Sequence, residues 1–201
     1  MNDLSAFVLA GGKSSRMGSD KAFLELNGST LLARALSLAK AVTKNLSIVG
    51  AREKFESSER ELQVPVIEDV YRGQGPLAGI HAALRGTRTE LNLVISVDMP
   101  FLESRFLEFL VTQARSCDAV VTVPRANGSF QPLCAIYRPQ FREVAQRALD
   151  QGNNKIGALF SASEVSVRII EEDEIRKLAF DPAMFHNLNT PEDLRRAAHL
   201  L

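Results

Sequence analysis

Short apolar runs alternate along this chain with segments in which apolar residues recur every three or four positions. The runs predict buried strands, and the periodic segments predict amphipathic helices. The expected strands cover residues 6–9, 46–49, 64–67, 93–97, 119–123, 133–137 and 165–170. The expected helices cover residues 30–42, 77–84, 101–114, 139–149 and 156–160. This alternation with short connections predicts a doubly wound α/β fold with a mostly parallel sheet.

Two of the expected helices have clear apolar faces. In residues 30–42 the face consists of Leu31, Leu32, Ala35, Leu38, Ala39 and Val42. In residues 101–114 it consists of Phe101, Leu102, Phe106, Phe109, Leu110 and Val111. Residues 93–97 are apolar almost throughout, which is typical of a central parallel strand that is covered on both faces. Because such sheets bind ligands beyond the carboxyl ends of their strands, we expect the chemistry at that edge.

Length and charge narrow the classes of function. We expect residues 1–201 to form a single domain. The 24 basic and 24 acidic residues cancel, so no overall field favours nucleic acid or an anionic membrane as a partner. No apolar run approaches the length of a membrane span, and we expect a cytoplasmic protein. Cys117 and Cys134 lack metal-ligand spacing, and Cys134, in an apolar run, is expected to be a buried free thiol.

A glycine-rich turn follows the first strand, with the sequence LAGGKSSRMGSDK over residues 9–21. Glycines let backbone N–H groups converge on an anion, and Lys13, Arg16 and Lys21 add positive charge. The glycine spacing fits neither the dinucleotide-binding pattern nor the P-loop pattern. The cations instead surround the loop, which suits a triphosphate that lies across it. A purely structural turn would not need this basic content.

Two carboxylates also follow expected strands. Asp98 comes directly after the most apolar strand, where it could ligate Mg²⁺ that bridges phosphate oxygens. The alternative is that Asp98 caps the helix that follows. Asp69 ends the strand at 64–67 and could contact the ribose or base of a nucleotide, or be a solvated loop residue. The small residues of 73–79 could admit a flat ring or serve close helix packing.

Other polar residues have structural interpretations. The three histidines, at positions 81, 186 and 199, lack metal spacing. The acidic residues 171–174 are expected to form a solvated face and a helix start. Residues 187–189 are expected to end a strand, followed by a helix with Thr190 as N-cap and Pro191 at its first position.

Taken together, these motifs resemble those of the molybdenum cofactor guanylyltransferases. In that family L-A-G-G-x-S-x-R-M-G-x-D-K opens the chain, and here it is complete over residues 9–21. The family's G-P-L-A-G, D-x-P and N-x-N-T-P-E motifs match residues 75–79, 98–100 and 187–192. The resemblance implies a Rossmann-like nucleotidyltransferase fold in three α/β/α layers. It also implies transfer of GMP from Mg-GTP to molybdopterin, which yields the guanine dinucleotide cofactor and pyrophosphate.

The resemblance implies roles for single residues. Backbone at Leu9, Ala10 and Gly11 would hold guanine, and Gly12 onward would hold the phosphates. The expected catalytic residues are Arg16, Lys21 and Asp98, with Asp98 as the Mg²⁺ ligand. The further residues expected on the GTP side are Asp69, Gly75 and Gly79, and those expected on the molybdopterin side are Lys155, Asn187 and Asn189. Residues of about 1–125 would form the nucleotide-binding half and about 126–201 the molybdopterin-binding half. The family further implies a molybdenum insertion enzyme and molybdoenzyme chaperones as partners.

The chain departs from its relatives in two places, and two other functions stay open. Residues 49–51 lack an Asn that some relatives have, and a basic pair is reduced to Lys155. A cytidylyltransferase acting on molybdopterin or on a sugar or polyol phosphate is one alternative. Relatives that use CTP commonly have Ala where this chain has Gly11, and the missing methyl favours a purine. A non-catalytic nucleotide-binding module is the other alternative, although Arg16, Lys21 and Asp98 are all present.

Overall fold

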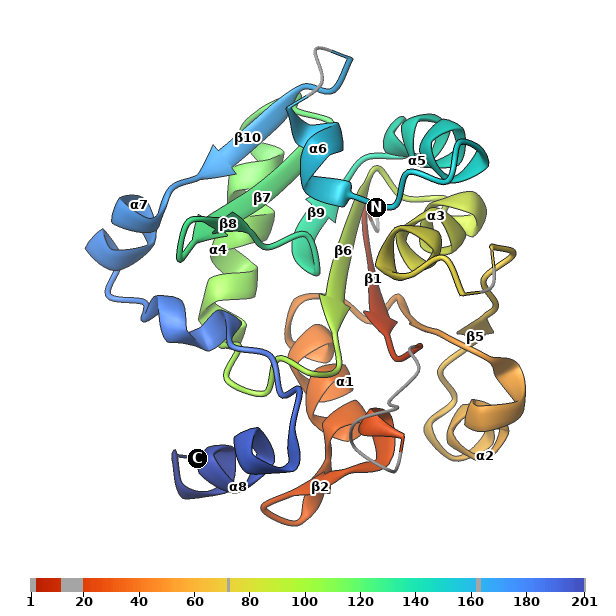
Figure 1. The fold of residues 1–201 in the computed structure, drawn as a ribbon, viewed down its shortest axis with the longest axis vertical. Helices are drawn as coiled ribbons and strands as arrows, with labels where there is room; N and C mark the ends of the chain where they lie inside the picture. The colour runs from red at the N-terminus through yellow and green to blue at the C-terminus, as the bar shows by residue number, and fades with distance from the viewer. Residues whose placement is uncertain (1–2, 12–19, 72, 162–163, 201) are drawn as a thin grey trace.

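A mostly parallel sheet runs through the middle of the protein, with helices on both of its faces (Figure 1). The structure is a computed structural model that describes residues 3–11, 20–71, 73–161 and 164–200. The strand order is β10-β7-β9-β6-β1-β4-β5, and β8 pairs with β7. The strands of this sheet are β1 (Leu4–Leu9), β4 (Leu46–Val49), β5 (Val66–Ile67), β6 (Leu91–Ser96), β7 (Val121–Ala126), β8 (Ser129–Phe130), β9 (Cys134–Tyr137) and β10 (Val167–Ile170).

Helices connect these strands, and a small hairpin precedes the first long helix. The hairpin pairs β2 (Glu25–Leu26) with β3 (Ser29–Thr30). The α-helices are α1 (Leu31–Val42), α2 (Arg52–Leu62), α3 (Pro76–Gly86), α4 (Ser104–Arg115), α5 (Phe141–Asp150), α6 (Ile156–Phe160), α7 (Glu172–Lys177) and α8 (Pro191–Leu200). Two short 3-10 helices are η1 (Lys21–Phe23) and η2 (Pro182–Phe185). None of the helices among the described residues has the length and apolar character needed to span a membrane.

Strand β1 lies at the centre of the parallel part of the sheet. It pairs in parallel with β4 and with β6, so that Val8 lies opposite Ile48 on one side and Ile95 on the other. Strand β9 is antiparallel to both of its neighbours, β6 and β7, and β10 is parallel to β7. The doubly wound, mostly parallel α/β sheet predicted from the sequence is confirmed.

The two faces of the sheet belong to two separate hydrophobic clusters. Along β1, Ala6 and Val8 enter the cluster that contains the buried faces of α1 and α4. Phe7 and Leu9 point the other way, into the cluster that contains those of α3 and α5. Side chains of a strand alternate between its faces, so a strand that is apolar at every position needs cover on both sides. The expected three-layer α/β/α arrangement is therefore confirmed.

Several expected boundaries are wrong. Helix α4 begins at Ser104 rather than at 101, because residues 99–102 form a turn in which the Leu102 N–H donates to the Met99 carbonyl. Leu102 is buried all the same, which explains its place in the apolar pattern. The strands expected at 64–67 and 165–170 shorten to β5 and β10. On α1, Leu36 is buried, whereas Leu38 and Val42 are only partly buried.

Two hairpins and one α-helix were not expected from the sequence. The β2–β3 and β7–β8 hairpins turn at Asn27-Gly28 and Asn127-Gly128, where all four residues have positive φ. An Asn-Gly pair is the strongest short signal for such a turn, so the sequence did contain this information. The sequence of helix α2 shows no helical apolar pattern. Its residues are mostly polar, and among those whose burial the structure describes Phe55 is the one that is completely buried.

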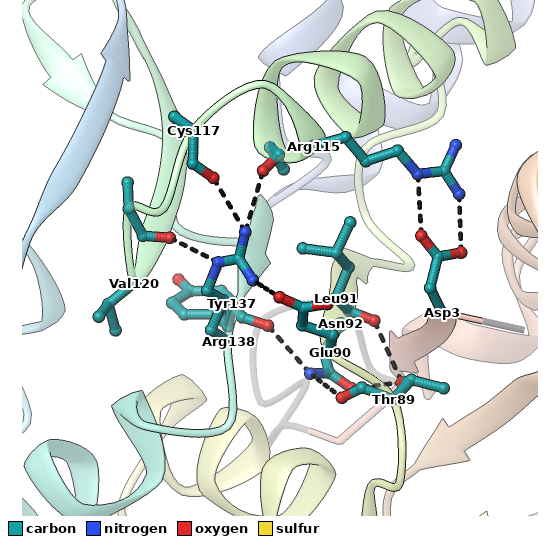
Figure 2. Close-up of polar contacts among 12 residues, drawn as sticks. Asp3, Thr89, Glu90, Leu91, Asn92, Arg115, Cys117, Val120, Tyr137 and Arg138 are labelled. Carbon is teal, nitrogen blue, oxygen red and sulfur yellow. Dashed lines mark hydrogen bonds and ion pairs between the residues drawn. The ribbon is translucent and has the colours of Figure 1, made fainter.

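Polar side chains close the sheet at the amino end of β6 (Figure 2). The Arg138 guanidinium donates to the carbonyls of Ala114 (3.3 Å), Cys117 (2.9 Å) and Ala119 (3.1 Å), and it pairs with Glu90. Close by, the fully buried Asn92 side chain donates to the Tyr137 carbonyl at 3.0 Å. This end of the sheet is therefore held by hydrogen bonds, whereas the carboxyl ends of the strands carry the candidate site.

Both cysteines are free thiols. Cys134 is completely buried, as expected, and burial raises the pKa of its thiol far above the usual range. Because the thiolate is the reactive form, burial disfavours reaction at Cys134 in the folded protein.

Candidate functional site

The candidate site lies where β1, β4 and β6 end. The Ala10 N–H donates to the Val49 carbonyl at 2.9 Å, and the Val97 N–H donates to the Leu9 carbonyl at 3.2 Å. The chain moves from β1 to β4 on one side and later to β6 on the other, which makes β1 the topological switch point of the sheet. Open α/β sheets bind ligands at such a point. The start of the glycine-rich turn, at Leu9 and Ala10, and Asp98 therefore share one edge, as the sequence predicted.

Asp98 is held in place by groups from two segments. Its Oδ1 accepts a hydrogen bond from Ser96 Oγ at 2.7 Å, and its Oδ2 pairs with Lys21 Nζ at 3.1 Å. The side chains of Lys21 and Asp98 are 20% and 17% exposed, so the pair is largely shielded from water but still accessible. Asp98 does not cap a helix, because α4 begins at Ser104 and its N-cap residue is Glu103. The structure thus excludes the capping alternative.

Lys21 connects three segments that are far apart in the sequence. It begins the short helix η1, for which Asp20 is the N-cap and accepts from the Ala22 N–H at 3.3 Å. Besides Asp98, its Nζ donates to Asn189 Oδ1 at 3.0 Å. The end of the glycine-rich turn, the end of β6 and the segment before α8 therefore meet at one ammonium group.

The segment 187–189 is not the strand end that we expected from the sequence. It runs beside the end of β6, where the Leu188 N–H donates to the Asp98 carbonyl at 2.9 Å. Helix α8 follows with Thr190 as N-cap and Pro191 at its first position, as predicted. The Oδ1 atom of Asn187 is buried and accepts no hydrogen bond from the described residues. A buried acceptor of this kind is costly, and it marks Asn187 as a candidate ligand-binding residue.

The glycines near the site are explained by different structural requirements. Gly75 precedes α3 with φ 76° and ψ −163°, a conformation that is essentially restricted to glycine. A Cβ at Gly79 would lie 2.1 Å from Leu9 Cδ2, so this glycine lets α3 pack directly on β1. For Gly79, then, the structure supports the close-packing interpretation. A Cβ at Gly11 would lie 3.8 Å from Gly50 Cα, which is ordinary contact.

Asp69 lies beyond the end of the edge strand β5. Its Oδ1 accepts a hydrogen bond from the Tyr71 N–H at 2.6 Å. Strand β5 pairs with β4 through Ile48–Val66 and Val49–Ile67, so Asp69 belongs to the same edge of the sheet as Gly11 and Gly50.

Not every expected site residue joins this group. Lys155 precedes α6, which lies in the upper half of Figure 1, whereas α8 lies near the bottom. The hydrogen bonds that Lys155 forms with described residues are local: its N–H donates to Asn153 Oδ1 at 3.2 Å, and its carbonyl accepts from the Ala158 N–H at 3.1 Å. Gly12 and Arg16, as well as Lys13, lie outside the described residues.

The structure adds contacts that sequence reasoning missed. Ser96 lies two positions before Asp98, and the two-residue period of a strand could have indicated that they share a side. Lys54 of α2 pairs with Asp20 at 2.6 Å, and Phe55 contacts the ring of Phe23 with centroids 5.6 Å apart. No pattern in the sequence indicates this contact between α2 and η1.

Comparison with known proteins gives consistent matches. Residues 6–166 match the family described as MobA-like NTP transferase domain. A probable molybdenum cofactor guanylyltransferase from Pelotomaculum thermopropionicum is 34% identical over 197 residues, which cover 98% of this chain and 93% of the relative. A protein of the same name from Carboxydothermus hydrogenoformans is 32% identical over 196 residues, which cover 98% of this chain and 95% of the relative.

A solved structure is similar over nearly the whole chain. The crystal structure of molybdopterin-guanine dinucleotide biosynthesis protein A from Archaeoglobus fulgidus superposes with a TM-score of 0.85 and 28% sequence identity. The alignment covers 98% of this chain and 97% of that protein. The likeness therefore includes both the strands on the β1 side and the segments after β9.

Proposed function

Because the chain belongs to the MobA-like NTP transferase domain family, we propose that it transfers GMP from GTP to molybdopterin. The observation that supports this most directly is the meeting of Lys21, Asp98 and Asn189 at the carboxyl edge of the sheet. Each of the three comes from a different motif of the family. A cation and a carboxylate side by side at a topological switch point suit a metal-bound triphosphate.

The transfer needs little chemistry from the protein. A phosphate oxygen of molybdopterin attacks the α-phosphorus of GTP, the bond from that phosphorus to the bridging oxygen breaks, and the electron pair leaves with pyrophosphate. The attacking phosphate is already an anion, so no strong general base is required. The protein's contribution is therefore positioning and the neutralisation of charge. Lys21 is the described residue that we expect to neutralise triphosphate charge, together with Arg16.

The residues at the site fit a magnesium ion. Asp98 presents two carboxylate oxygens, and no cluster of three or more His, Cys, Asp or Glu side chains occurs in the described part of the chain. Mg²⁺ is commonly held by one or two carboxylates together with substrate phosphates and water, so a single Asp is sufficient. When bound, the ion would supply positive charge to the phosphate oxygens. Asp98, oriented by Ser96, is the ligand that we propose.

We assign the acceptor side to the segment before α8. Asn187 offers a buried oxygen without a hydrogen-bond donor among the described residues, and Asn189 already contacts Lys21. We further propose that Lys155 contributes to molybdopterin binding from the second half of the chain. The division into halves at about residue 125, the two expected protein partners and the cytoplasmic location stay predictions.

A turnover assay tests the proposal. Purified protein with Mg²⁺ and molybdopterin is supplied with GTP, CTP or ATP, and the dinucleotide product is identified by mass. We expect the guanine product and pyrophosphate; a cytosine product would establish the cytidylyltransferase alternative, and the absence of any dinucleotide product would refute the proposal.

The Asp98→Ala variant tests the assignment of the catalytic carboxylate. We expect it to bind GTP but to lose about 10²–10³-fold in kcat, because one charge-stabilising group is removed. Asp118→Ala, which removes an exposed carboxylate outside the site, is the matched control. Undiminished turnover by Asp98→Ala would instead support a different metal ligand, whereas a wild-type protein that binds GTP without turnover would support the non-catalytic binding module.

A further inference from the structure

Tyr71 lies between the nucleotide side of the site and the second half of the chain. Its N–H donates to Asp69 Oδ1 at 2.6 Å, and its hydroxyl donates to Asp150 Oδ1 at 2.7 Å. Asp150 is the last residue of α5. The Tyr71 ring meets the His81 ring of α3 edge to face, with centroids 5.2 Å apart and planes at 82°. One residue thus contacts Asp69, α3 and α5.

The strand that precedes Asp69 provides little restraint of its own. Strand β5 is two residues long, lies at the edge of the sheet and pairs with β4 alone. Gly73 and Gly75, both with positive φ, follow Tyr71 before α3 begins. A short edge strand followed by glycines loses much conformational freedom when a ligand orders it. The hydrogen bonds of Tyr71 to Asp69 and Asp150 help to hold this segment before a ligand binds.

His81 forms a rigid surface for the Tyr71 ring. It is 4% exposed, and its Nδ1 has no hydrogen-bond partner among the described residues. Burial, helped by Arg85 and Arg142, lowers the pKa of His81, while Asp69 and Asp150 oppose this. A neutral ring at physiological pH is therefore favoured, and it offers an uncharged face for packing.

We propose that Tyr71 is a positioning residue, which holds the Asp69 carboxylate in place for the nucleotide by fastening residues 69–71 to α5 through Asp150. This inference rests on the proposed function, in which Asp69 contacts the nucleotide. It assigns to Tyr71, His81 and Asp150 a task that none of the motifs indicates. It also connects the nucleotide side physically to α5, after which the chain continues to Lys155.

The test asks whether Tyr71 acts through Asp69. Binding of GTP with Mg²⁺ is measured by calorimetric titration for Tyr71→Phe, Asp69→Ala and the double variant. Losing one hydrogen bond that orders the segment is expected to raise the Kd of Tyr71→Phe about 3- to 10-fold, with kcat at saturating GTP nearly unchanged. In the Asp69→Ala background, Tyr71→Phe should have no further effect on the Kd.

Variants of the partner residue separate positioning from general stability. Asp150→Asn keeps an oxygen acceptor and is expected to bind GTP like the wild type, whereas Asp150→Ala should match Tyr71→Phe. The matched control is Tyr137→Phe, which removes the hydroxyl of the other tyrosine of the chain. That hydroxyl donates to the Pro132 carbonyl at 2.7 Å, so its loss should lower stability and leave the Kd for GTP unchanged.

Two results would overturn the inference. One is a Tyr71→Phe protein with the wild-type Kd for GTP, and the other is an equal effect of Tyr71→Phe with and without the Asp69 carboxylate. Failure of the proposed function would be seen separately, in the turnover of the wild-type protein. If the wild type uses CTP, the same ratios of Kd values are measured with CTP.

Discussion

At the scale of single residues, the site depends on a few atoms whose neighbours are now defined. The carboxylate of Asp98 is oriented by Ser96 and faces Lys21, which also reaches Asn189. These residue types and their motifs were expected from the sequence, but their mutual contacts were not. The sequence also does not distinguish the roles of the glycines. Gly11 and Gly79 belong to similar small-residue motifs, yet a Cβ would fit at Gly11 and would collide with Leu9 at Gly79.

The contact distances make Gly11→Ala a direct test of nucleotide choice. A methyl group there would touch Gly50 Cα and the Val49 carbonyl at ordinary distances of 3.8 and 3.9 Å, so the fold should tolerate it. If the base lies against Gly11, the methyl should lower the preference for GTP over CTP, measured as the ratio of kcat/KM values, about 10- to 200-fold.

Gly86→Ala, at the end of α3 with open space around it, is the matched control for Gly11→Ala. It should leave the ratio of kcat/KM values as it is in the wild type. An unchanged ratio in Gly11→Ala would place the base elsewhere and remove this residue from the explanation of specificity.

At the scale of elements, the junction between residues 187–189 and α8 decides where Asn189 lies. Thr190 Oγ1 accepts from the Asp193 N–H at 3.1 Å, while Asp193 Oδ2 accepts from the N–H groups of Asn189 and Thr190. The hydrogen bonds that the Asp193 carboxylate accepts, first of all the one from Asn189, lower the pKa of Asp193. Their contribution to stability is therefore present above pH 3.8, the ordinary pKa, and is lost as the pH falls through the lower pKa of the folded state.

Removing the cap should loosen the acceptor side of the site. Thr190→Ala is expected to destabilise the start of α8 by about 1 kcal/mol, because the Asp193 N–H loses its acceptor. Amide hydrogen exchange over residues 189–193 should become faster, and the KM for molybdopterin should rise. Thr190→Ser retains an oxygen at this position and serves as the control. Equal exchange rates in Thr190→Ala and the wild type would contradict the capping role.

Elements with a strong apolar pattern were predictable, and those without one were not. Strand β4 and helix α6 begin and end where the pattern indicated, because the apolar residues of each are buried in the hydrophobic clusters. Helix α2 was missed, since its buried Phe55 packs against tertiary neighbours such as Gly50 and Phe23 and not as part of an apolar helix face. The start of α4 was misplaced because Leu102 is buried from a turn rather than from a helix.

At the scale of the whole molecule, the two ends of the sheet have different tasks. The amino end of β6 is closed by Arg138 and Asn92, and the carboxyl ends of β1 and β6 carry the Lys21–Asp98 pair. The hydrogen-bond network around Arg138 and Asn92 helps to stabilise the fold. The site at the other end can therefore retain polar atoms that lack a hydrogen-bond partner among the described residues, such as Asn187 Oδ1.

The division of tasks predicts that Arg138→Ala destabilises the protein without weakening GTP binding. The guanidinium satisfies three carbonyls and its side chain is 11% exposed, so its loss should cost about 2–4 kcal/mol in urea unfolding. Arg115→Ala removes an exposed pair with Asp3 nearby and should cost at most about 1 kcal/mol. Equal losses in the two variants, or a weaker Kd for GTP in Arg138→Ala, would contradict this interpretation.

By itself, the sequence determined the class of fold, the family and the motifs that line the edge of the sheet. It could do so because strand and helix periodicity and the glycine-rich turn are local properties, expressed within a few residues. Only the tertiary structure decided that Lys21 lies between Asp98 and Asn189 and that Tyr71 connects Asp69 to α5. Such contacts depend on how strands pair and helices cross, which no local pattern specifies.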